Sequence, residues 1–167
     1  MLYRWAREEE EAEYVLTITN EIELRAQRPV VFDLLTTTQY WPHWHVSTRS
    51  VAGVTDRPYV LGEVIHEHAE METERAIITW RCVAHDGPHS AALESSEHAA
   101  RILYKLEDAG DHTLLARQLT VDPAMVRSVA PTDSAARELL WRISQQSLQR
   151  FQLLVHAMHP PRADAPA

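Results

Sequence analysis

A long stretch near the C-terminal end of the sequence carries one apolar stripe with the period of an α-helix. Apolar and small residues recur there at spacings of three and four, as in an amphipathic helix with one buried face. The stripe consists of Ala136, Leu139, Leu140, Ile143, Ser147, Phe151, Leu154, Val155 and Met158. Thr132 or Asp133 is a candidate N-cap after Pro131, and Pro160 with Pro161 would stop the helix. We therefore expect a helix of about 25 residues whose apolar face needs a partner surface.

The sequence before this helix has the pattern of antiparallel strands. From Leu16 to residue 25, apolar and polar residues alternate, as in a strand with one buried face. Turn signals at residues 56–58, 86–88 and 108–111 divide the following segment into a meander. Six further strands are expected, near residues 46–55, 62–71, 75–85, 90–97, 99–107 and 113–122.

Two short helices are expected between the first strand and the other six. Pro29 suits the first turn of a helix, where its missing N–H is harmless, and a short apolar run follows it. The aromatic segment at residues 40–45 predicts a turn or a second short helix, whose rings need a large surface to pack on. The sequence thus predicts an α+β fold that ends in its longest helix.

This order of elements resembles the helix-grip fold. The likeness is carried by residues 28–35 (RPVVFDLL) leading into 40–44 (YWPHW), by 79–88 (TWRCVAHDGP), and by the terminal helix. These segments are similar to the START-like superfamily (SRPBCC, or Bet v 1-like), in particular its bacterial polyketide cyclase/dehydrase and lipid-transport branch. The resemblance implies a curved seven-stranded antiparallel sheet around the long helix, with a cavity for an apolar or aromatic molecule. It implies the fold more than the reaction, because the superfamily includes carriers, receptors, cyclases and chaperone cofactors.

Composition narrows the class of protein further. The chain has 167 residues, a formal net charge of -8 and one cysteine. The acidic balance argues against nucleic-acid binding, which needs a basic surface, and no run reaches the roughly 18 to 20 apolar residues of a membrane span. The single Cys82 excludes an intramolecular disulfide. We expect a cytoplasmic, bacterial protein with a charged arm at residues 1–13, one domain at 14–159 and a disordered tail at 160–167; a homodimer stays open.

Side-chain parity suggests which residues face the implied cavity. We expect the parity that contains Trp80 to face inward on strand 75–85, and the parity that contains Tyr104 on strand 99–107. The expected ligand-binding residues are Trp41, Trp44, Ile78, Trp80, Ile102, Tyr104, Leu119 and Phe151. For the tryptophans, ordinary core packing is the competing interpretation. Cys82 is expected to be a small buried hydrophobe.

Arg117 and Tyr104 are candidates for polar chemistry inside such a cavity. Arg117 shares its parity with Leu115 and Leu119, which would place a guanidinium in the cavity, where it could hold a carboxylate or a phenolate. The opposite parity, with Leu114, is nearly as apolar, so the orientation of this strand stays open. Tyr104 could act as a hydrogen-bond donor or weak acid, or could simply reach a buried carbonyl.

His66 and His68 form the strongest histidine cluster in the sequence. With Glu70 they alternate along one strand and therefore share a face. They could form a proton-transfer group or a two-histidine, one-carboxylate metal site. Alternatively they face solvent, because Ile65 and Ala69 give the opposite parity an apolar character. The cupin pattern also has a His-x-His strand, but its glycine offsets and its second motif are missing here. We expect no metal and no cofactor.

Three classes of function follow from these features. The first is a carrier or binding protein for a hydrophobic or aromatic molecule, lipid-like or polyketide-like. The second is a polyketide cyclase or dehydratase type of enzyme that uses Tyr104, His66, His68 or Arg117 as acid, base or charge stabiliser. The third is a protein-interaction module, such as a chaperone cofactor or a stress protein. Convergence of at least two titratable groups inside the cavity would favour the enzyme.

Overall fold

Seven strands form one antiparallel sheet in the computed structural model, which describes residues 15–160. The strands are β1 (Leu16–Leu24), β2 (Thr48–Gly53), β3 (Val64–Met71), β4 (Glu74–Asp86), β5 (Ser90–Ser95), β6 (Ala100–Ala109) and β7 (His112–Val121). Their order is β1-β7-β6-β5-β4-β3-β2, so β2 to β7 form a meander and β1 pairs with its last strand. The α+β helix-grip prediction is confirmed. The expected arm at residues 1–13 and residues 161–167 of the tail expected at 160–167 lie outside the described residues.

The strand limits differ from the predicted ones where local geometry breaks the pairing. β2 starts at residue 48, because the preceding residues form a turn in which Thr48 donates its backbone N–H to the carbonyl of His45 at 3.2 Å. β3 starts at residue 64, because Gly62 has a φ of 86°, which lies outside the strand region. Both changes shorten the strands at the β2 edge of the sheet.

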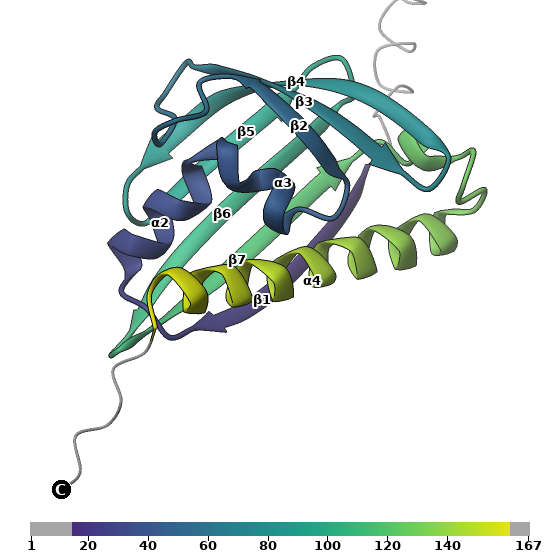
Figure 1. Cartoon of the computed structure of the whole chain (residues 1–167). Coiled ribbons are helices and arrows are strands. Elements are labelled where there is room, and N and C mark those ends of the chain that lie inside the picture. The colour runs from purple at the N-terminus through teal and green to yellow at the C-terminus, as the bar shows by residue number, and fades with distance from the viewer. Residues whose placement is uncertain (1–14, 161–167) are drawn as a thin grey trace, which may run out of the picture.

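The connection from β1 to β2 contains the predicted short helices, α2 (Arg28–Thr36) and α3 (Trp41–Trp44), with the one-turn helix η1 (Thr38–Tyr40) between them (Figure 1). α2 and α3 both carry proline in their first turn, which fixes φ at a helical value without loss of a hydrogen bond. Another one-turn helix, η2 (Pro123–Val126), follows β7 and was not predicted. Asp122 begins it by accepting the backbone N–H of Ala124 at 2.8 Å.

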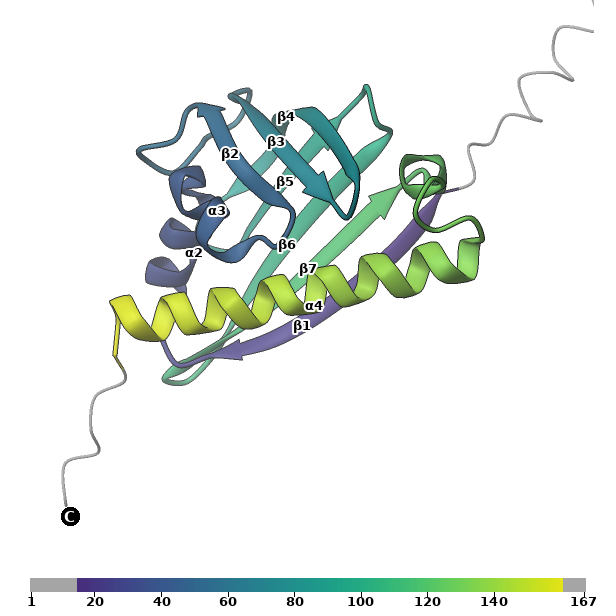
Figure 2. The same ribbon diagram turned by 45° about the vertical axis from the view of Figure 1, so that its right-hand side comes forward.

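The predicted long helix is α4 (Asp133–Met158). Thr132 is its N-cap and accepts the backbone N–H of Ala135 at 3.1 Å, as the sequence suggested. Figure 2 shows α4 lying along β1 on the concave face of the sheet, with α3 above it and η2 near its start. α4 packs closely on β1, and the cavity described below lies between the helix and the centre of the sheet.

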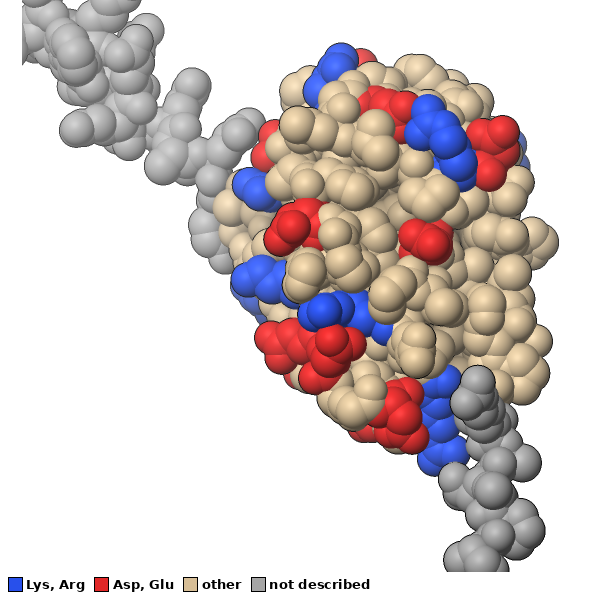
Figure 3. All heavy atoms as spheres, turned by 90° about the vertical axis from the view of Figure 1, so that its left-hand side faces the viewer, with Lys and Arg blue, Asp and Glu red and all other residues tan. Residues whose placement is uncertain are grey.

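No helix among residues 15–160 is both long enough and apolar enough to cross a membrane. On the face shown in Figure 3, acidic and basic side chains occur in small mixed groups, and neither sign dominates that side of the molecule. Opposite charges interspersed in this way give weak local fields and no extended basic surface on that face.

Candidate functional site

A cavity of about 230 Å³ lies between α4 and the sheet. β3, β4, β6 and β7 form one wall, while η2 and α4 form the other. Its middle is apolar, because alternate residues of the strands point into it opposite the stripe of α4. The apolar residues that define this middle part include Ile78, Ile102, Leu119, Leu140 and Ile143.

The two ends of the cavity differ in exposure. At the end next to η2, the lining includes Glu74 and Arg75, which are exposed, and Met71 and Met125, which are half-buried. Val121 of β7 lies beside η2. Arg117, four residues before it on the same strand, also lines the cavity and is 3% exposed. The cavity therefore has one end near solvent and one deep end.

The deep end carries a buried cation. Arg117 of β7 donates from Nη1 to the hydroxyl of Ser144 on α4 at 2.8 Å. Its Nη2 lies 3.1 Å from Nε2 of His45, which follows α3. Its Nε is buried without a hydrogen-bond partner. Arg117 thus joins the sheet to α4 and to the turn after α3, and its Nε donor has no hydrogen-bond partner.

His45 is neutral in this arrangement. A guanidinium can only donate hydrogen bonds, so Nε2 of His45 is an acceptor and its proton lies on Nδ1. That Nδ1 is 3.3 Å from the hydroxyl of Ser47 and 3.8 Å from a carboxylate oxygen of Glu67. Burial, together with the neighbouring charge of Arg117, lowers the pKa of His45 from its ordinary value of 6.5 to about 3.

Glu67 of β3 is a second buried charge at the same end. It is 3% exposed, and Trp80 donates its indole N–H to one carboxylate oxygen at 2.7 Å. Thr48 donates its hydroxyl to the other oxygen. Both oxygens therefore have donors, as a buried carboxylate requires.

The turn that carries His45 is positioned by α4. Ser147 accepts the backbone N–H of Val46 at 3.0 Å and donates its own hydroxyl to the carbonyl of Ile143 at 2.8 Å. Ser144 and Ser147 are three residues apart and therefore share a face of the helix. These two small polar residues let α4 hold both Arg117 and the His45 turn.

Four of the expected ligand-binding residues line the cavity. Ile78, Trp80, Ile102 and Leu119 are among its lining residues, and so is Arg117. On β4 and β6, the side chains expected to face inward therefore do so. On β7, the inward set is the one that contains Arg117, which was one of the two alternatives.

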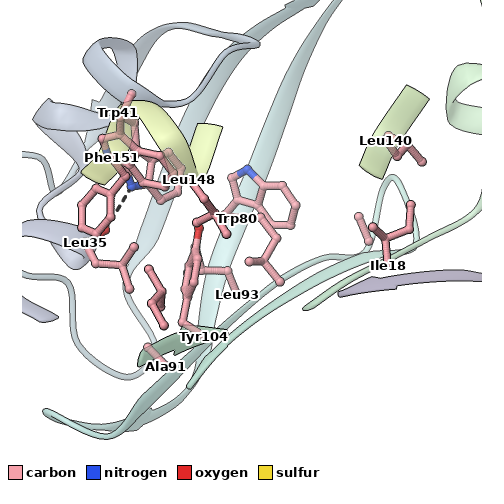
Figure 4. Packing of buried hydrophobic residues seen from close by; sticks show 14 of the residues in the cluster. Ile18, Leu35, Trp41, Trp80, Ala91, Leu93, Tyr104, Leu140, Leu148 and Phe151 are labelled. Carbon is pink, nitrogen blue, oxygen red and sulfur yellow. Dashed lines mark hydrogen bonds between the residues drawn. The ribbon is translucent and has the colours of Figure 1, made fainter. Parts of the chain in front are cut away.

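The other four are not among the residues that line this cavity, and their role in ligand binding stays a prediction. Trp41 and Phe151 are buried in the core beyond the deep end, where α3 meets α4 (Figure 4). Trp44, in α3, is buried as well. The Trp44 and Phe151 rings lie 5.0 Å apart between centroids. These large rings fill that end of the molecule. This arrangement agrees with the core-packing interpretation of the tryptophans.

Tyr104 is also excluded from the lining, although it faces inward. It pairs in register with Arg117 on the neighbouring strand and is 1% exposed. Burial raises the pKa of its phenol above the usual 10. A buried phenol with a raised pKa that does not line the cavity is a poor acid at neutral pH.

His66 and His68 lie outside the cavity, on the outer face of β3, and are exposed. His66 contacts the hydroxyl of Thr79 through Nδ1 at 3.1 Å. No group of three metal-ligating side chains that could hold an ion occurs among residues 15–160. Glu67, between these histidines, is the residue that points inward.

Sequence reasoning missed Glu67 and His45. The sequence did indicate Glu67, because it lies on the same face of its strand as the apolar residues Ile65 and Ala69. An acidic residue on an apolar strand face indicates a buried polar partner. His45 had no comparable signal, because its position depends on the contact between Val46 and Ser147.

The same fold occurs in solved structures of other proteins. A START superfamily protein from Mycobacterium smegmatis superposes with a TM-score of 0.70 at 12% identity, over 85% of this chain and 98% of that one. Zhui aromatase/cyclase from Streptomyces sp. R1128 superposes with a TM-score of 0.65 at 16% identity, over 92% and 100% of the two chains. The protein TTHA0849 from Thermus thermophilus gives 0.70 at 12% identity, over 86% and 99%.

These similarities confirm the expected START-like fold, which is shared with Bet v 1-like proteins. At this level of identity they establish the architecture alone and assign no role to a residue. No protein-family model and no curated protein matches the sequence. The functional argument therefore depends on the cavity itself.

Proposed function

We propose that the chain binds a hydrophobic or aromatic small molecule in the cavity between the sheet and α4, as a carrier or binding protein. The observation that carries this proposal is a cavity with an apolar middle and a few polar groups at one end. Its volume of about 230 Å³ exceeds that of an engineered cavity of about 150 Å³ that takes up benzene. A molecule with one or two rings, or a short lipid-like chain, fits this space.

The experiment that tests this proposal fills the cavity and measures binding. In Leu119→Trp the new indole would occupy the apolar middle, whereas in Leu114→Trp, on the opposite parity of the same strand, it would stay outside the cavity. Titrated with 2-naphthoate and with 2-naphthamide, Leu119→Trp should lose at least about tenfold in affinity and Leu114→Trp less than about twofold. Equal affinities of both variants would contradict the proposal. Native mass spectrometry of the purified chain would identify any retained ligand.

An enzyme of the polyketide cyclase or dehydratase type is the second candidate. The convergence of Glu67, His45 and Arg117 at the deep end of the cavity favours it. The pKa of His45, about 3, opposes it, because a general base works best with a pKa near the operating pH. The lone pair of His45 Nε2 is also engaged by Arg117. These groups are better suited to hold and orient a guest than to move its protons.

The third candidate, an interaction module, has less support, because such a module needs no internal cavity. A cytoplasmic location and a homodimer stay predictions that localisation of the tagged chain and size-exclusion chromatography would test.

A further inference from the structure

The charge of Arg117 has no anionic partner in contact with it among the residues that the structure describes. The hydroxyl of Ser144 and the imidazole of His45, which are its hydrogen-bond partners, are both neutral. The phenol of Tyr104 on the neighbouring strand also interacts with Arg117 and is neutral, because burial raises its pKa. Among residues 15–160, no ion pair includes Arg117. Its side chain is nevertheless buried and lines the cavity. A buried charge without a counterion is strongly unfavourable unless another molecule supplies one.

Glu67 does not neutralise this cation by contact. The imidazole of His45 lies between the two charges, with Nε2 toward Arg117 and Nδ1 toward Glu67. The carboxylate oxygens of Glu67 already accept hydrogen bonds from Trp80 and Thr48. Arg117 therefore remains the group at the deep end whose charge and whose free Nε–H are not satisfied.

The guanidinium is also held in place before any ligand binds. Ser144 fixes Nη1 from the helix and His45 fixes Nη2 from the turn after α3. A donor that is already oriented loses little conformational entropy when it binds a guest. Planar guanidinium groups in such settings recognise carboxylates and related oxyanions strongly.

We infer that the ligand is an organic acid whose carboxylate or acidic phenolate pairs with Arg117 at the deep end, while its apolar body lies against Ile78, Leu119 and Ile143. This inference rests on the proposed function and names the chemical class of the guest. The acid enters first and the apolar end remains toward η2, where the lining is exposed. A neutral molecule of the same shape would leave the cation without a counterion.

The test compares two probes that differ only in charge, 2-naphthoate and 2-naphthamide, by calorimetric titration of the full chain at pH 7.5. The wild type should bind the acid at least about tenfold more tightly than the amide. In Arg117→Gln this ratio should fall to within about twofold, because Gln keeps hydrogen-bonding capacity without charge. The matched control is Arg101→Gln, since Arg101 is exposed on the same sheet and lines no part of this cavity. The control should keep the wild-type ratio.

The outcomes separate the two proposals. If the wild type binds the amide as tightly as the acid, the inferred ligand class is wrong while the proposed binding function stands. If neither probe binds, both are overturned. Because the comparison of the two probes uses the wild type, it remains decisive even if Arg117→Gln fails to fold, which circular dichroism would show.

Discussion

Arg117 and His45 are joined across the deep end of the cavity, with Nη2 of the guanidinium 3.1 Å from Nε2 of the imidazole. The contact joins a strand of the sheet to the turn after α3, which are far apart in the sequence. Burial, with the charge of Arg117, keeps the histidine neutral, and the contact orients the arginine. The electrostatic character of the cavity therefore depends on a pair of residues of which the sequence identified only one.

The first prediction concerns the pH dependence of stability. The pKa of His45 is about 3 in the folded chain and 6.5 when unfolded, so below pH 6.5 the unfolded state binds more protons. The contribution of His45 is fully present above pH 6.5 and is lost as the pH falls toward 3, by on the order of a few kcal/mol. Urea unfolding of the wild type and of His45→Gln between pH 7.5 and 4 would measure it. The variant should show a shallower decline, and parallel curves would contradict the assignment.

The second prediction concerns the aromatic contact beyond the deep end. Phe151 is fully buried against Trp44, so Phe151→Ala should lower the free energy of unfolding by about 3–5 kcal/mol. Leu153→Ala is the matched control on the same helix, since Leu153 is 69% exposed, and should change it by less than about 0.5 kcal/mol. Chemical denaturation measures both. A similar loss in the two variants would mean that α4 packs through a different face.

The third prediction concerns the serine that positions the His45 turn. Ser147→Ala removes the acceptor of the Val46 N–H and should cost about 1–3 kcal/mol. It should also weaken binding of 2-naphthoate, because His45 no longer holds Arg117 in place. Ser134→Ala, at an exposed position near the start of α4, is the control for stability and binding. Unchanged affinity in Ser147→Ala would show that the turn is held without this hydrogen bond.

The fourth prediction concerns the start of α4. Thr132→Ala should destabilise the protein by about 1 kcal/mol, because the N–H of Ala135 loses its acceptor. Thr132→Asp should restore most of that stability, since its carboxylate can accept the same N–H and also favours the positive end of the helix dipole. Thermal unfolding of the two variants would distinguish a capping role from simple packing of the threonine methyl group.

The order of elements and the inward faces of the strands could be predicted because they depend on local patterns. The alternation around Trp80 and the stripe along α4 are each set by neighbours within a few residues. The polar end of the cavity could not be predicted in the same way. The hydrogen bond between Val46 and Ser147 joins residues 101 positions apart, and it determines where His45 lies.

The candidate site residues that lie outside the cavity do so for two different physical reasons. Trp41 and Trp44 were expected in the cavity, with core packing as the competing interpretation, and both are buried where α3 meets α4. His66 and His68 were considered as catalytic groups because of their chemistry, whereas the strand parity already placed them opposite Ile65. Parity along a strand was the stronger guide, and Glu67 was its overlooked exception.

Among residues 15–160, the exposed lining of the cavity lies at the η2 end, so a guest would arrive and depart there. A molecule anchored by its acid at the bottom must break that ionic contact before any other part can leave. The lifetime of the complex then depends on the contact between the acid and Arg117. The length of the guest's apolar end, which lies toward η2, can vary. Such an asymmetry suits a chain that retains one class of molecule and accepts several members of it.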